Sequence, residues 1–227
     1  MTAYYYKEVP PYHTSGFCAV RDALDNLSNV LQLAEIINHC QYFSTEIIEK
    51  TFDLVVFSGN HRRVIIKKDD GHFSMSIPFQ IVSSDDKMIA FNFDYLGEEV
   101  NGRFISIMRN AIQTVRGLPH SHEEIILSIA DSFHLDVPEA TKYYDAFATL
   151  IAEDHGYFRF DDDPNNINGD IHPRYHFDIF YKNTTSIKIG YDKSARIECF
   201  YSLFDSSMPK KYLTTMPLKS KLSASFK

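Results

Sequence analysis

Apolar residues recur at helical spacing near the start of the chain. Between about residues 18 and 40, one face of an amphipathic helix is formed by Val20, Leu24, Leu27, Leu31, Ala34 and Ile37. Ser44 and Thr45 are plausible helix caps, and they stand before the apolar pair Ile47 and Ile48, which predicts a second, shorter helix. We therefore expect an N-terminal helix packed on a core.

The spacing changes to strand-like alternation after residue 51. Four runs rich in β-branched and aromatic residues follow one another, at 52–58, 62–68, 73–81 and 89–95. Asp70-Gly71 between the second and third runs is a hairpin signal. Pro78 lies within the third run and cannot donate a ladder hydrogen bond, so that strand is expected at an edge or with a bulge. The four runs together predict an antiparallel meander.

Helical spacing returns from about residue 103 and continues to about residue 155. Gly117 and Pro119 end one apolar stripe, and Ser121 with Glu124 forms a capping-box pattern that starts the next helix. Pro138 marks the first turn of a third helix. The run from 122 to 161 resembles a winged helix-turn-helix, but its second helix carries Glu139, Asp145, Glu153 and Asp154 against Lys142 alone. Such a helix would be repelled by phosphate, so a plain αα-hairpin is favoured.

Alternation over 175–181, 187–191 and 197–201 predicts a second meander of three strands. We therefore predict an α+β fold: two antiparallel meanders flank a central helical group, and an amphipathic helix precedes them. Residues 1–206 are expected to form one domain, with 1–100 and 101–206 as the alternative pair of sub-domains. Residues 207–227 carry lysines and no acid, which predicts a basic tail that is mobile or bound to a partner.

Composition excludes several classes of protein. A 227-residue chain with 44% hydrophobic and 23% charged residues can build an ordinary core. Its formal charge of −7 disfavours general nucleic-acid binding. Three scattered cysteines fit a reducing compartment, and we find neither a signal-peptide pattern nor an apolar run of about 18 residues. A cytoplasmic protein without membrane association is expected.

Local basic residues form a separate candidate contact surface. Arg62 and Arg63 flank a predicted strand, and Lys210 and Lys211 belong to the tail. These four residues are candidate contacts to a partner protein or a nucleic acid. Protection of an exposed strand edge by basic side chains is the simpler explanation for the arginines.

The stretch 156–181 holds the densest chemistry of the chain. If Tyr175 and Phe177 face the core, His176 and Asp178 share the opposite face, and they form the candidate catalytic pair. Imidazole and carboxylate suit Zn, Mn or Fe, and the candidate metal ligands are His172, His176, Asp178, Asp161 and Asp163. The spacing matches no established metal motif, so an Asp-rich turn with a His-Pro loop anchor is the favoured explanation.

The same stretch carries a resemblance. Phe158-Arg-Phe-Asp-Asp-Asp-Pro164, then His172-Pro-Arg-Tyr-His176, then the hairpin through 185–190, resembles a family of bacterial proteins known only as a domain of unknown function. The matching positions are Arg159, Asp161, Asp163, Pro164, His172, Pro173 and His176, and Asp162 stands where the family has Tyr. The resemblance covers about a fifth of the chain and implies a companion of other proteins in mobile-element or anti-phage loci.

Three functions are compared. The leading hypothesis is a non-catalytic accessory or adaptor subunit of a bacterial multi-protein system, acting by protein–protein binding and needing no cofactor. The alternative is a metal-dependent hydrolase, most plausibly a nuclease, that uses a divalent ion held by the cluster at 161–178. The third is a nucleic-acid-binding module, whose affinity would fall steeply with salt. Self-association into a homo-oligomer is compatible with each of them.

Overall fold

The computed structural model describes residues 2–40, 43–44, 52–59, 62–83, 88–117, 121–153, 156–169, 171–180, 187–192, 194–195 and 200. These residues form five helices and eleven strands in antiparallel sheets, which confirms the predicted α+β class. Two predictions fall outside the described residues: the short helix after Thr45, and the basic tail with Lys210 and Lys211. Of the strand predicted over 197–201 only Phe200 is described, and it is not in a strand.

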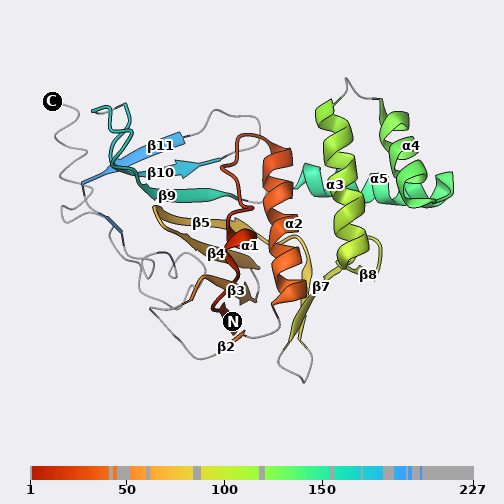
Figure 1. Cartoon of the computed structure of the whole chain (residues 1–227), viewed down its shortest axis with the longest axis horizontal. Helices are drawn as coiled ribbons and strands as arrows, with labels where there is room; N and C mark the ends of the chain where they lie inside the picture. Colours follow the sequence, from red (N-terminus) through yellow and green to blue (C-terminus); the bar gives the residue numbers. More distant parts are fainter. Residues whose placement is uncertain are drawn as a thin grey trace.

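The main sheet has eight antiparallel strands (Figure 1). In spatial order they are β11 (Ile187–Tyr191), β10 (Tyr175–Ile179), β9 (Phe158–Asp162), β5 (Gly71–Ser76), β4 (Arg63–Lys68), β3 (Leu54–Ser58), β1 (Thr2–Tyr6) and β2 (Phe43–Ser44). Strands β3, β4 and β5 follow one another as the first meander predicts, and the turn before Gly71 joins β4 to β5.

Strand β9 pairs with β5 on one side and with β10 on the other, and so joins strands of the two predicted meanders into this one sheet. Gly71 lies opposite Asp161, and a Cβ atom at residue 71 would lie 1.9 Å from the carbonyl oxygen of Phe160. Only a glycine therefore lets β9 approach β5 this closely. The sheet includes residues from both 1–100 and 101–206, although the division into sub-domains stays a prediction.

A second, three-stranded sheet is formed by β6 (Gln80–Ser83), β7 (Ile89–Phe93) and β8 (Glu98–Glu99). The run that was predicted as a single strand over 73–81 is thus divided between two sheets, with Pro78 at the break. Proline has no N–H for the ladder, which explains why the strand ends there. The sequence predicts an edge position or a bulge at Pro78. The chain instead changes sheet there: it leaves the main sheet after Ser76 and enters the second sheet as its edge strand β6.

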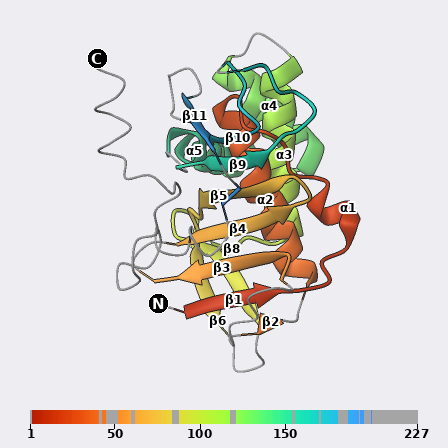
Figure 2. The same cartoon turned by 90° about the vertical axis from the view of Figure 1, so that its left-hand side faces the viewer.

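The helices lie on one side of the main sheet (Figures 1 and 2). They are α1 (Pro11–Thr14), α2 (Ala23–His39), α3 (Gly102–Gly117), α4 (His122–Phe133) and α5 (Val137–Ala152). Asp22 caps α2, Asp136 caps α5, and Ser121 with Glu124 forms the predicted capping box of α4. Helix α2 lies next to the sheet, and α3, α4 and α5 lie farther out.

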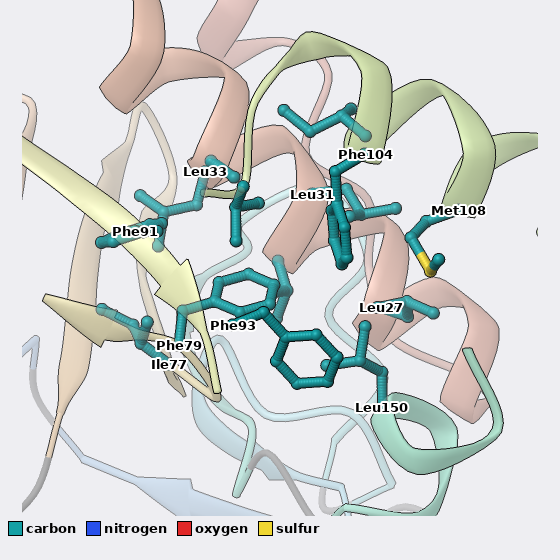
Figure 3. Close-up of a cluster of buried hydrophobic side chains, with 14 of the residues drawn as sticks. Leu27, Leu31, Leu33, Ile77, Phe79, Phe91, Phe93, Phe104, Met108 and Leu150 are labelled. Atoms are coloured by element: carbon teal, nitrogen blue, oxygen red, sulfur yellow. The ribbon is translucent and has the colours of Figure 1, made fainter. Parts of the chain in front are cut away.

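Two hydrophobic cores hold these layers together. The larger core lies between the helices and the sheets, where Phe79 and Phe93 pack edge to face at 5.7 Å and meet Phe104 of α3 (Figure 3). The smaller core lies on the other face of the main sheet and includes Phe160, Phe177 and Phe200. Both faces of the sheet are therefore covered, which explains the near-continuous apolar run of β3.

No helix within the described ranges is both long and apolar enough to cross a membrane.

Candidate functional site on strands β9 and β10

Strands β9 and β10 place four ionisable residues on one face of the main sheet. Phe160 and Phe177 are paired across the two strands and point into the smaller core. Side chains alternate between faces, so the neighbours of these phenylalanines point to the opposite face, where His176 pairs with Asp161 and Asp178 with Arg159. The alternation read from the sequence thus leads to the observed grouping of His176 with Asp178.

Arg159 is the centre of an ion-pair network. Its Nε donates to Asp161 Oδ2 at 2.6 Å, and a terminal N–H donates to Asp178 Oδ2 at 2.8 Å. Lys188 of β11 places its Nζ 2.8 Å from the other oxygen of Asp178, Oδ1. Burial acts to lower the pKa of Arg159, but the adjacent Asp161 carboxylate and its neighbours raise it, so the guanidinium stays charged.

His176 completes the network and is fully buried. Its Nδ1 lies 2.8 Å from the carbonyl oxygen of Pro173, which can only accept, so Nδ1 carries the donated proton. Its Nε2 lies 3.3 Å from Asp161 Oδ2 and 3.8 Å from Asp178 Oδ2. Burial raises the pKa of the Asp161 carboxyl, and Arg159 and His176 act in the opposite direction.

The five candidate metal ligands separate into two groups. Asp161, His176 and Asp178 offer donor atoms that all lie within 4.8 Å of one another. His172 instead donates through Nε2 to Asp163 Oδ2 at 3.2 Å, although its ring lies 4.8 Å from that of His176. The sequence thus predicts a single cluster, whereas the structure has a buried triad beside a more exposed His–Asp pair.

The connection between β9 and β10, here called the tip loop (residues 163–169 and 171–172), is braced by its own polar groups. Asp163 accepts hydrogen bonds from the backbone and side chain of Asn166. The backbone of Asn168 pairs with that of His172 in an isolated β-bridge. This bracing agrees with the predicted Asp-rich turn and His-Pro anchor.

Two large apolar side chains project from the tip loop. Ile167 is 55% exposed and Ile171 is 79% exposed. Arg174 at the base of the loop donates to Asp162 at 2.7 Å and stacks on the ring of Tyr175. The tip loop therefore exposes two apolar side chains, and the charges of Arg174 and Asp162 at its base are paired.

The basic candidates near β4 are placed differently from one another. Arg63 donates to Ser74 Oγ, Ser76 Oγ and the carbonyl oxygen of Gly156, and it lies over the ring of Phe158. The Arg63 guanidinium thus links β4 and β5, through hydrogen bonds, to the segment that precedes β9. Arg62 is half-buried and close enough to Glu153 to act on the pKa of that carboxyl, which burial raises.

Sequence reasoning did not assign a site role to Arg159 or Lys188. The signal for Arg159 was present, because it alternates with Phe158 and Phe160 and therefore shares a face with Asp161. No sequence pattern indicates that Lys188 lies at the site. Its position depends on the register of β10 with β11, in which Asp178 pairs with Lys188.

Comparisons with known proteins found no matching family model, no matching curated protein and no matching solved structure.

Proposed function

We propose that this chain is a non-catalytic accessory subunit that binds another protein through its tip loop. The observation that carries the proposal is the exposure of two isoleucines on one short, braced loop: Ile167 is 55% exposed and Ile171 is 79% exposed. A single exposed apolar residue is ordinary on a protein surface. Two strongly exposed isoleucines on one short loop favour a surface that another protein covers.

The bracing of the tip loop supports the same conclusion. Association must offset the entropy lost when loops and side chains become ordered at an interface. The hydrogen bonds from Asn166 to Asp163, and the bridge between Asn168 and His172, already fix the backbone that carries both isoleucines. A preformed tip of this kind lowers the cost of binding.

The burial of His176 favours an accessory role over hydrolysis. A general base or a catalytic metal needs access to substrate and water. The His176 side chain is fully buried, and Arg159 donates hydrogen bonds to the neighbouring carboxylates of Asp161 and Asp178. The network is therefore better suited to holding the base of the tip loop than to meeting a substrate.

The chemistry of the tip loop indicates what the partner offers. Asp162 is paired with Arg174, and Asp163 accepts a hydrogen bond from His172, so both carboxylates at the base have partners within the chain. The complementary surface is an apolar recess that accepts two isoleucine side chains. The resemblance of residues 158–190 to a bacterial family of unknown function, whose members look like companions of other proteins in mobile-element or anti-phage loci, implies a partner subunit encoded in the same locus.

Recovery of the chain with its native neighbours tests this proposal. We expect the wild type to retain a partner and the Ile167→Ser/Ile171→Ser variant to lose it, because the apolar contact is removed without touching the core. Leu127→Ser is the matched control, since Leu127 lies on α4 and is 52% exposed. A solitary monomer, or a partner retained by the double variant, would contradict the proposal.

A further inference from the structure

Three metal-ligating side chains converge on the helix-facing side of β9 and β10. Asp161 and His176 are direct cross-strand partners, and Asp178 is two residues beyond His176 on the same face. Their donor atoms all lie within 4.8 Å of one another. Because all three come from regular strands, the backbone fixes their spacing more firmly than a loop would.

The buried imidazole of His176 indicates that this cluster can bind an ion. Its Nδ1–H is donated to the Pro173 carbonyl, so in the neutral ring Nε2 is the nitrogen that carries the lone pair. That Nε2 is buried and has no hydrogen-bond partner among the residues that the structure describes. It points toward Asp161 Oδ2 at 3.3 Å and Asp178 Oδ2 at 3.8 Å, and neither carboxylate can donate to it when ionised. Two carboxylate oxygens facing this nitrogen favour a positive species between them, either a proton on Nε2 or a metal ion.

We propose that Asp161, His176 and Asp178 bind one divalent transition-metal ion, which fixes the base of the tip loop. In a tetrahedral zinc site with bonds of about 2.1 Å, neighbouring ligand atoms are about 3.4 Å apart. The two separations from His176 Nε2, 3.3 Å and 3.8 Å, are close to that value. Donation of the other ring nitrogen to a backbone carbonyl is the usual arrangement of a metal-bound histidine.

The surrounding cations determine how tightly the ion binds. Arg159 donates to the Oδ2 atoms of both aspartates and so orients the carboxylates, but its charge opposes that of the metal. Lys188 contacts Asp178 Oδ1 and is 27% exposed, so it can turn toward solvent when the ion binds. Loss of the Lys188 charge is therefore expected to tighten metal binding, whereas loss of a ligand is expected to weaken it strongly.

Titration of the full, chelator-treated chain with Zn²⁺ tests the site, with affinity measured by competition against a chromophoric chelator near neutral pH. We expect one Zn²⁺ per chain, weakening by more than about 100-fold in His176→Ala and in Asp178→Asn. Lys188→Met is expected to tighten binding by about tenfold, because a competing cation is removed. His122→Ala is the matched control and should keep the wild-type affinity, since His122 is an exposed histidine on α4 and is not part of the triad or its surroundings.

Two results would overturn the proposal: no stoichiometric Zn²⁺ binding by the wild type, or equal binding by wild type, His176→Ala and Asp178→Asn. Should these variants fail to fold, the wild type supplies the decisive readout by nitrogen NMR of its histidine rings. Zn²⁺ should shift the His176 Nε2 resonance, and an unchanged resonance at saturating Zn²⁺ refutes the site. These measurements use the isolated chain, so they do not depend on whether the tip loop binds a partner.

Discussion

At the scale of single residues, two arginines of the same strand–loop–strand unit differ in what surrounds them. Arg159 and Asp161 are both largely buried, with side-chain exposures of 19% and 10%. Arg174 and Asp162 form an equally short pair, but their exposures are 47% and 34%. Breaking a buried ion pair leaves an uncompensated charge, whereas an exposed pair exchanges its partner for water.

Arg159→Met should therefore lower the free energy of unfolding by about 3 kcal/mol, because Asp161 and Asp178 lose their shared partner. Arg174→Met, the control in the same unit, should change it by less than about 1 kcal/mol. Urea unfolding followed by circular dichroism measures both. Equal effects of the two substitutions would show that Arg159 does not hold the unit together.

Glu35 provides a prediction about pH. The Arg109 side chain donates to Glu35 at 2.7 Å and lowers the pKa of that carboxyl. A lowered pKa in the folded state stabilises the protein above the unfolded pKa, which is about 4.3 for glutamate, and this contribution is lost as the pH falls through the folded value. Glu35→Gln should flatten the fall in stability below about pH 4. Unfolding curves that decline equally in both proteins would contradict this assignment.

At the scale of elements, the contact of β5 with β9 decides how the halves of the chain meet. β9 connects the helices to β10, and its antiparallel register with β5 sets Asp161 opposite Gly71. The β9–β10 unit therefore depends on a residue about 90 positions earlier in the chain. That dependence links the candidate site to the first meander.

Gly71→Ala should destabilise the protein by about 2 kcal/mol or more, because the new methyl group meets the Phe160 carbonyl and forces the strands apart. Gly117→Ala is the control: Gly117 ends α3, and a Cβ atom there has nothing within 4 Å. Thermal unfolding compares the two variants with the wild type. A Gly71→Ala protein as stable as Gly117→Ala would mean that β5 and β9 are not in this register.

At the scale of the whole molecule, local patterns predicted the elements, and long-range pairing decided their arrangement. Helix caps such as Asp22 and Ser121, and the alternation through Phe177, depend on near neighbours and are readable from sequence. The approach of β9 to β5, and of Lys188 to Asp178, depends on register between distant segments. The separation of His172 from His176 likewise follows from a loop geometry that spacing alone does not determine.

The account makes the tip loop the surface on which the protein acts, held from below by β9 and β10. Its most direct test is the dissociation constant of the recovered partner for the wild type, Ile167→Ser/Ile171→Ser and Leu127→Ser, measured by calorimetry on purified proteins. We predict that the tip-loop variant binds at least about tenfold more weakly, a loss of about 1.4 kcal/mol, and that the Leu127 variant binds as the wild type does. Equal dissociation constants for all three proteins would contradict the account.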